Sequence, residues 1–185
     1  MEHFYQNIKG WTSGKHFIMF DQVIDQMPQN CLWVEVGVWQ GQSVSYCAVE
    51  LINKQKFGEF YAVDSFDGGI ELKDFKVVRN NKLKETFLNN LGPLAEKIKT
   101  IQSLSWDGAE HFEDNSIDFC YIDAGHTYDC VSKDIAAWYP KIKKNSLIGG
   151  DDYDKEVKVA VDEFIQKENL ILEVIGRCWL TRKNK

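Results

Sequence analysis

The sequence of 185 residues has no apolar run that approaches about 18 residues, the length that a membrane-spanning helix needs. Residues 1–6 lack both the charged and the apolar regions of a secretory signal. The chain also has only three prolines, no internal repeat and no Pro/Gly/Ser-rich linker. We therefore expect one domain in the cytoplasm without a membrane partner, with residues 1–30 as a helical cap on a core formed by residues 31–185.

Two further absences narrow the class of protein. The five cysteines are odd in number and show no CxxC spacing, which indicates a reduced, intracellular protein. The net charge is -6, and residues 182–185 form the only basic cluster. Because no basic block offsets the acidic balance, we do not expect a nucleic-acid backbone as the main partner.

What the sequence does contain is an alternation of apolar runs and helical patterns. Near-continuous apolar runs are typical of strands buried on both faces of a parallel sheet. The predicted strands are residues 32–36, 60–63, 98–101, 117–122 and a segment around 147–148. The predicted helices are residues 42–53, residues 82–91, one that carries Val131, Ile135 and Trp138, and one that carries Val157, Val161 and Phe164.

The end of the chain has a different pattern. Residues 170–175 and 178–181 read as two strands joined by a tight turn at Gly176 and Arg177, which predicts an antiparallel hairpin. Together with the five strand–helix units before it, this hairpin predicts an α/β fold. Its centre is a doubly wound, mostly parallel seven-stranded sheet with an antiparallel C-terminal hairpin.

A glycine turn follows the first strand in the pattern Glu35-x-Gly37-x-x-x-Gly41. Gly37 lets the backbone come close to a ligand, and Gly41 leaves backbone N–H groups facing outward at the start of the next helix. Residues 38–40 break the GxGxxG pattern of dinucleotide-binding proteins, and the chain has no GK[ST] for a nucleoside triphosphate.

Two acids accompany this turn. Asp64 closes the second strand, and in a right-handed βαβ unit it lies beside the glycine turn, where it can accept hydrogen bonds from both hydroxyls of a ribose. Glu35 lies inside an apolar run, and a buried carboxylate needs a partner, for which an amino group is attractive. The alternative for Glu35 is an edge acid that caps a neighbouring loop.

Three more carboxylates end the fourth and fifth strands, which are neighbours in this topology. Asp123, Asp151 and Asp152 therefore converge, and like charges at short distance raise each other's pKa unless a cation lies between them. Oxygen ligands without sulfur favour Mg²⁺, with Mn²⁺ or Ca²⁺ as alternatives. His126, three residues beyond Asp123, is placed to take a proton from a substrate hydroxyl.

Each of these residues also has a purely structural interpretation. Asp123 would then cap the following helix, and His126 would be an N-terminal helix residue bonded to the backbone. Asp151 and Asp152 would form a turn before a helix.

Taken together, four segments resemble the class I S-adenosylmethionine-dependent methyltransferases, and within them the macrocin-type sugar and catechol-type metal-dependent O-methyltransferases. The likeness covers roughly residues 30–165 and includes an Asp-x-x-His-x-Tyr motif and a Gly-Asp-Asp-Tyr motif. The segments are Val34–Ser43, Ala62–Phe66, Asp118–Tyr128 and Gly149–Tyr153.

The resemblance implies a Rossmann-like methyltransferase fold and a role for each matching position. Asp64 would hold the ribose of the cofactor, and Asp123 would contribute both to the cofactor site and to catalysis. His126 would be the catalytic base, although those enzymes often carry a lysine at its position. Asp123, Asp151 and Asp152 would bind the metal. The other implied cofactor-binding residues are Glu35, Gly37, Val38, Gly41 and Ser43 at the methionine end, and Ser65, Phe66, Ser103 and Trp106 near the adenine.

The expected reaction is methyl transfer from S-adenosylmethionine to a hydroxyl of a small sugar or phenol, assisted by a divalent metal, Mg²⁺ above all. Aromatic residues at 11, 17, 75 and 106 would shield the reacting groups, and a homodimer partner is one source of a substrate cap. Two alternatives use the same residues: a metal-dependent hydroxylase or other non-methylating enzyme, and an S-adenosylmethionine-binding protein without turnover.

Overall fold

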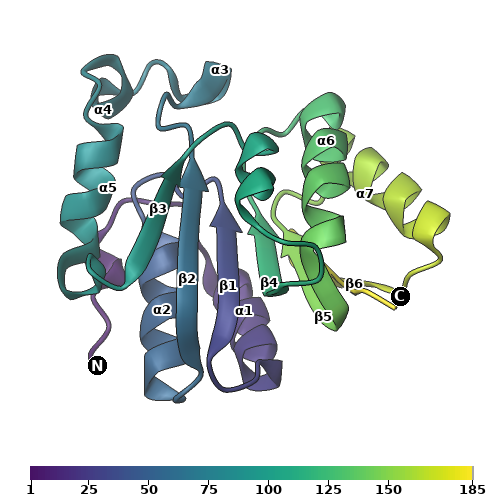
Figure 1. Cartoon of the computed structure of the whole chain (residues 1–185). Coiled ribbons are helices and arrows are strands. Elements are labelled where there is room, and N and C mark those ends of the chain that lie inside the picture. Colours follow the sequence, from purple (N-terminus) through teal and green to yellow (C-terminus); the bar gives the residue numbers. More distant parts are fainter. Residues whose placement is uncertain (185) are drawn as a thin grey trace.

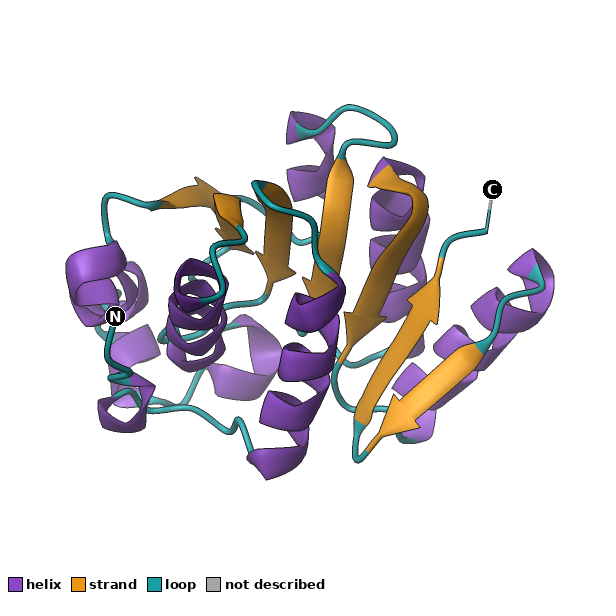
Figure 2. Cartoon of the chain, turned by 90° about the horizontal axis from the view of Figure 1, so that it is seen from below, coloured by secondary structure: helices purple, strands orange, loops and turns teal. Residues whose placement is uncertain are grey.

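The computed structural model describes residues 1–184, except for the side chains of residues 70 and 71. At its centre lies a seven-stranded sheet in the order β3-β2-β1-β4-β5-β7-β6, with helices on both faces (Figures 1 and 2). The strands are β1 Cys31–Val36, β2 Phe57–Asp64, β3 Ile98–Gln102, β4 Ile117–Ile122, β5 Ile142–Gly150, β6 Leu172–Ile175 and β7 Cys178–Arg182.

The helices alternate with the strands along the chain. The longer ones are α1 Gly14–Gln26, α2 Gln42–Asn53, α5 Leu83–Leu91, α6 Tyr128–Trp138 and α7 Lys155–Glu168. Short helical turns complete the chain: η1 Tyr5–Asn7, α3 Gly69–Leu72, α4 Lys76–Arg79, η2 Gly92–Leu94, η3 Asp107–His111 and η4 Tyr139–Lys141.

The pairing of the strands confirms the predicted fold class. β3, β2, β1, β4 and β5 pair in parallel, whereas β7 pairs antiparallel with both β5 and β6. The chain reverses its direction of winding between β1 and β4, so the carboxyl ends of these two strands flank the switch point where open α/β sheets bind ligands.

Two apolar layers hold the helices to the sheet. Side chains alternate along β1, so that Trp33 belongs to the layer under α1, α2 and α5, and Val34 to the layer under α6 and α7. Glu35 follows the side-chain direction of Trp33 and therefore faces the α2 side. This alternation explains how a carboxylate can sit in an otherwise apolar strand and reach the first turn of α2.

The predicted elements are all present, with differences at their ends. Residues 42–53 and 117–122 match α2 and β4, but β5 begins at Ile142, five residues before the apolar segment that predicted it. Polar side chains at residues 143–145 hide this part of the strand from the apolar pattern, and residues 144 and 145 are exposed. The five cysteines are free thiols. Within residues 1–184, no helix is both long and apolar enough for a membrane span.

The C-terminal residues are tied back to the sheet by one buried lysine. Lys183 is 7% exposed, and its Nζ donates to Ile142 O at 2.8 Å, Asn115 Oδ1 at 3.0 Å, Pro140 O at 3.1 Å and Tyr139 O at 3.2 Å. These acceptors belong to the loop before β4 and to the approach to β5. The ammonium group of Lys183 thus connects the end of β7 to the starts of β4 and β5.

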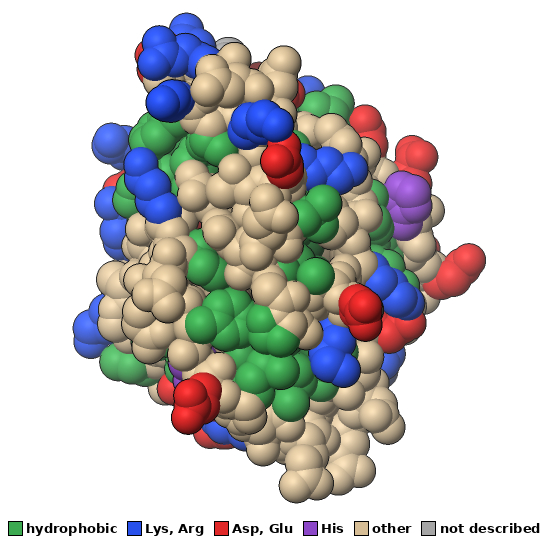
Figure 3. Space-filling model, turned by 90° about the vertical axis from the view of Figure 1, so that its left-hand side faces the viewer, with side chains coloured by type: hydrophobic (Ala, Val, Ile, Leu, Met, Phe, Trp, Pro, Cys, Tyr) green, Lys and Arg blue, Asp and Glu red, His purple; other side chains and the backbone are tan. Residues whose placement is uncertain are grey.

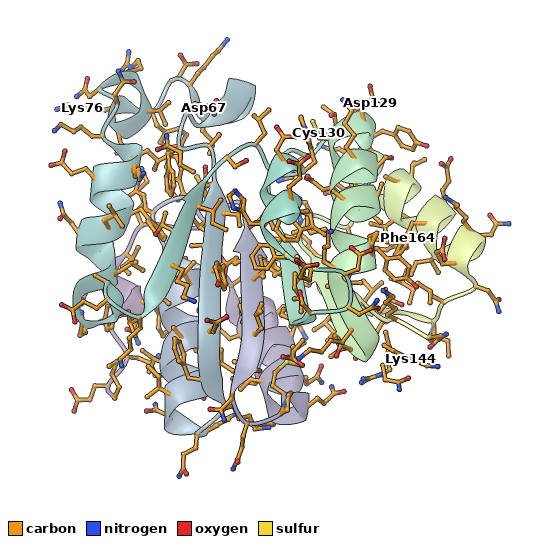
Figure 4. The ribbon with its side chains drawn as sticks, viewed as in Figure 1. Asp67, Lys76, Asp129, Cys130, Lys144 and Phe164 are labelled. Carbon is orange, nitrogen blue, oxygen red and sulfur yellow. The ribbon has the colours of Figure 1, made fainter. Side chains whose placement is uncertain are left out.

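Replacing Lys183 with Met is expected to lower the free energy of unfolding by about 2 kcal/mol, because buried carbonyl groups lose a charged donor. Urea unfolding measures this change. Lys144→Met is the matched control, since Lys144 is an exposed lysine of β5 (Figure 4) and should change stability by less than about 0.5 kcal/mol. Equal effects of the two substitutions would contradict the anchoring role of Lys183.

Candidate cofactor and acceptor site

Loops from several strands meet at the carboxyl-terminal edge of the sheet, which is the upper edge in Figure 1. Figure 4 places Asp67, after β2, and Asp129 and Cys130, in the first turn of α6, along this edge. The four segments that carried the sequence resemblance include the ends of β1, β2, β4 and β5, which are neighbours in the sheet, so they come together at this edge.

The glycine turn fits closely against the end of β4. Gly37 has φ +83°, and a Cβ added there would lie 2.0 Å from the carbonyl oxygen of Asp123. Gly41 has φ +91° and is the N-cap of α2. At position 37, only glycine permits both the backbone conformation and the approach to Asp123. The first glycine of the motif is thus explained by contact with the acid-bearing loop.

Asp64 holds the glycine turn in place. Its Oδ2 accepts the backbone N–H groups of Val38 at 2.8 Å and Trp39 at 3.2 Å, and its Oδ1 accepts that of Phe66 at 2.7 Å. Burial raises the pKa of Asp64, while the three amide hydrogen bonds oppose this rise. A carboxylate has about four acceptor positions, so these bonds leave about one for a ligand.

Glu35 is 1% exposed and lies beneath the turn. The Ser43 hydroxyl donates to its Oε1, while its Oε2 is buried without a hydrogen-bond partner among the described residues. Burial raises the pKa of Glu35 to about 8. An unpartnered carboxylate oxygen below a glycine turn provides a position for a cationic donor such as an amino group.

On the other side of Gly37, a histidine lies between two of the predicted metal-binding acids. His126 Nε2 is 3.1 Å from Asp152 Oδ2 and 3.7 Å from Asp123 Oδ1. One donor atom from each of these three residues lies within 4.8 Å of the others. Burial raises the pKa of Asp123, and Asp151 and Asp152 add to this rise against a hydrogen bond with His126. Arg177 also binds Asp152.

The third predicted metal-binding acid belongs to a different group of side chains. Asp151 Oδ2 lies 2.7 Å from Nε2 of His16, a buried residue in the first turn of α1. Cys178 Sγ is 3.9 Å from Asp151 Oδ1. Burial acts to raise the pKa of Asp151, but the hydrogen bond and charge of His16 outweigh it and lower the pKa.

The N-terminal segment crosses the glycine turn and is tied there by Gln42, the first residue of α2. The Gln42 side chain donates to Ile8 O at 3.1 Å and accepts the N–H of Thr12 at 3.0 Å. Gly10 lies directly over this side chain, so that a Cβ on Gly10 would be 2.4 Å from Gln42 Oε1. Residues 8–12, which we call the strap, therefore cover the start of α2.

Aromatic rings close one side of the same region. Trp11, which is 59% exposed, packs on Trp39 with ring centroids 5.3 Å apart, and both rings contact Phe75. Beneath the strap lies a cavity of about 40 Å³. Its lining includes Trp11, His16, Gly37, Ser43, Tyr121, Asp123 and Asp151.

Basic side chains gather beside this region. Figure 3 shows lysine and arginine side chains at the top of the face where α4 lies, and Lys76 points away from the sheet there (Figure 4). The net negative charge of the chain is therefore unevenly distributed, with positive charge around α4 and acids at the ends of β4 and β5.

The residues predicted to lie near the adenine have mixed surroundings. Ser65 donates to Asp67 at 2.8 Å, and the backbone of Ser103 donates to Asp64 O at 3.1 Å. Phe66 is buried, and its ring packs on Phe87 with centroids 5.4 Å apart. Trp106 lies under the ammonium of Lys133 at 5.0 Å. Their contact with a cofactor stays a prediction.

Two residues that contact this region, His16 and Gln42, were not predicted from the sequence. His16 contacts an acid 135 residues away, and Gln42 contacts the strap from inside the glycine-rich segment. Ser13-x-x-His16 is a capping-box spacing with histidine in place of glutamate, and this variation could have drawn attention to His16. Trp11 and Phe75, which we expected near the reacting groups, do meet; Phe17 instead packs on Tyr46.

Comparison with known proteins agrees with this geometry. A model of the family described as methyltransferase domain matches residues 34–153, which span all the segments above. The chain belongs to this family. It is a class I S-adenosylmethionine-dependent methyltransferase, as the resemblance implies, and of the interpretations left open, methyl transfer is the one that the family supports.

Solved structures share the fold of this methyltransferase at low sequence identity. The O-methyltransferase NovP matches with a TM-score of 0.71 and 20% identity, over 92% of this chain and 80% of NovP. CalS11, a TDP-rhamnose 3'-O-methyltransferase, matches with a TM-score of 0.62 and 17% identity, over 90% and 77% of the two chains. An rRNA methylase from Streptococcus thermophilus matches with a TM-score of 0.63 and 14% identity, over 96% and 100%. A search of curated proteins found no match.

Glu35→Gln is expected to stabilise the ligand-free protein at alkaline pH. Because the pKa of Glu35 in the folded protein, about 8, exceeds its unfolded value of about 4.3, folding retains a proton that the unfolded chain loses. The cost of ionisation is absent below about pH 4, grows up to about pH 8 and is then complete. The variant should gain roughly 2–5 kcal/mol at pH 9 and nothing at pH 4.

Urea unfolding at pH 4, 7 and 9 measures this difference. Asp134→Asn is a useful comparison, because burial raises the pKa of Asp134 to about 7, so its gain should be complete about one pH unit earlier. A Glu35→Gln variant with wild-type stability at every pH would show that Glu35 is not a strained buried carboxyl.

Proposed function

We propose that this methyltransferase transfers a methyl group to a hydroxyl of a small acceptor, a sugar or a phenol, with the help of a divalent cation. The observation that carries the proposal is the contact of Gly37 with the backbone of Asp123. This contact sets the glycine turn directly beside the acids at the ends of β4 and β5. A methyl donor on the turn would therefore face a group of oxygen and imidazole donors.

The turn offers what the methionine end of the cofactor requires. The buried, unpartnered Oε2 of Glu35 matches the cationic amino group of S-adenosylmethionine. Ser43 orients the carboxylate through its other oxygen. Asp64 keeps the Val38 and Trp39 amides in position and retains about one acceptor site for a ribose hydroxyl. S-adenosylmethionine supplies an already activated methyl group, so that orientation is the main requirement of the protein.

The acids that follow β4 and β5 would bind the acceptor of the methyl group. The donor atoms of Asp123, His126 and Asp152 lie within 4.8 Å of one another, and the two carboxylates of this group would supply the hard oxygen ligands for a cation. Asp151 lines the same cavity as Asp123 and completes the predicted set of three acids. A divalent cation lowers the pKa of a bound hydroxyl. His126 is beside the two acids and can receive the proton that the hydroxyl loses.

Surroundings of two kinds support a small hydroxylated acceptor. The indole rings of Trp11 and Trp39 offer apolar faces, and the acids offer acceptors for hydroxyl groups. A ring that carries neighbouring hydroxyl groups meets both. CalS11, which shares the fold, is a TDP-rhamnose 3'-O-methyltransferase. We therefore propose catechol and TDP-rhamnose as the first acceptors to test, with transfer of a radiolabelled methyl group as the assay.

Glu35→Gln is expected to weaken the binding of S-adenosylhomocysteine, which has the same amino group as the methyl donor, by about 10–100-fold. The reason is that the amide lacks the charge that a buried ammonium needs. Calorimetric titration measures the affinity. Glu59→Gln is the control, because Glu59 is an exposed glutamate of β2 that pairs with Lys99. Unchanged affinity in Glu35→Gln would place the amino group elsewhere.

Asp152→Asn is expected to weaken the binding of Mn²⁺, a spectroscopic substitute for Mg²⁺, by at least about tenfold, because one oxygen ligand loses its charge. Paramagnetic resonance of the free ion measures binding in the presence of S-adenosylhomocysteine. Asp154→Asn is a closely matched control: Arg177 binds both acids, yet Asp154 is not in the group around His126. Equal loss in the two variants would place the cation elsewhere, and wild-type protein that binds no Mn²⁺ would remove the metal from the proposal.

A further inference from the structure

The strongest feature that the methyltransferase chemistry leaves unexplained is the contact between His16 and Asp151. His16 is buried, comes from α1 and lines the cavity together with Asp123 and Asp151. Its Nε2 lies 2.7 Å from Asp151 Oδ2. Asp151 follows β5 and is one of the three acids predicted to bind the cation, so His16 touches the site from the opposite end of the chain.

The start of α1 determines which nitrogen of His16 carries the proton toward Asp151. The backbone N–H of Ser13, the N-cap residue, donates to His16 Nδ1 at 3.0 Å, and the Ser13 hydroxyl lies 2.8 Å from the same nitrogen. Nδ1 therefore serves as an acceptor, and Nε2 is the nitrogen that donates. In this arrangement Nε2 of His16 is engaged with Asp151 and does not point a free lone pair at a substrate proton or a cation.

Attachment of α1 to the sheet does not require this pair. Met19, Phe20, Val23 and Ile24 of α1 are all completely buried in the apolar layer. An ion pair or charged hydrogen bond that is removed from water contributes little net stability compared with such packing. The position of the pair, in the wall of the cavity beside Asp123, suggests a role in the site.

We propose that His16 is a positioning residue that fixes the carboxylate of Asp151 for the acceptor and its cation. The inference rests on the proposed function, in which Asp151 is one of the metal-binding acids. Carboxylates that bind metals are themselves held by hydrogen bonds, and loss of such an outer partner costs about 10–100-fold in metal affinity or activity. The Ser13–His16–Asp151 chain thus links the start of α1 to the end of β5.

The test compares wild type with His16→Leu, which removes the donor, and with His16→Gln, which keeps an N–H donor at the end of a flexible side chain. Crystal structures give the position of the Asp151 carboxylate. Calorimetry with S-adenosylhomocysteine and paramagnetic resonance with Mn²⁺ give the two affinities. Methyl transfer to catechol or TDP-rhamnose gives kcat and KM for each variant.

We expect His16→Leu to displace the Asp151 carboxylate, to lower Mn²⁺ affinity and kcat by about 10–100-fold, and to change the affinity for S-adenosylhomocysteine by less than about twofold. His16→Gln should recover at least a third of the decrease in log kcat that His16→Leu causes. The combined variant His16→Leu/Asp151→Asn should be no worse than Asp151→Asn alone, because both changes remove the same interaction.

An unmoved Asp151 carboxylate in His16→Leu would overturn the inference, and so would losses that merely follow the unfolded fraction or that add to those of Asp151→Asn. Failure of the proposed function looks different. Wild-type protein would then show no Mn²⁺ binding and no methyl transfer, while the position of Asp151 in His16→Leu would still decide whether His16 holds it.

Discussion

The approach of Gly37 to the backbone of Asp123 is the constraint on which the site depends. β1 and β4 are neighbours at the point where the winding of the sheet reverses, and their carboxyl ends meet without an intervening side chain. The turn that carries the amide groups and the loop that carries Asp123 and His126 therefore share one wall. Any residue larger than glycine would separate the two halves of the site, because the missing Cβ position is occupied by the carbonyl of Asp123.

Around this contact, each of the acids that directly follow β4 and β5 lies beside a histidine. His126 lies between Asp123 and Asp152, and His16 contacts Asp151 in the wall of the cavity. Glu35 differs from them, since one of its oxygens has no partner among the described residues. Natural proteins accept such local costs where a ligand is to supply the missing interaction, and the apolar layers on both faces of the sheet provide the stability that this requires.

The fold was largely predictable because the strands near the centre of the sheet are buried on both faces. Their side chains are mostly apolar, which makes β1 and β4 visible as near-continuous runs, whereas the first half of β5 has polar residues and was missed. Strand order also brought Asp123 and Asp152 together as predicted. The His16–Asp151 contact could not be predicted, because it joins segments with no common local pattern and depends on where α1 packs.

Asp64 shows the same limit of prediction from sequence, here for residues that are closer in the chain. Position and topology predicted an acid beside the glycine turn, and the structure places it there. What the pattern could not indicate is that three backbone amides of this chain would occupy most of its acceptor capacity. The spacing of residues predicts proximity, whereas the number of hydrogen bonds that a side chain has left depends on the exact path of the backbone.

Gln42 has one further consequence. This residue belongs to the segment that begins α2 beside the glycine turn, yet its amide is shared with residues of the strap on both sides of Gly10. The start of α2 and the strap cannot vary independently, because a substitution of Gln42 alters both the first turn of α2 and the attachment of the N-terminal segment. The contacts of Gln42 with Ile8 and Thr12 thus make one side chain responsible for both the start of α2 and the position of the strap.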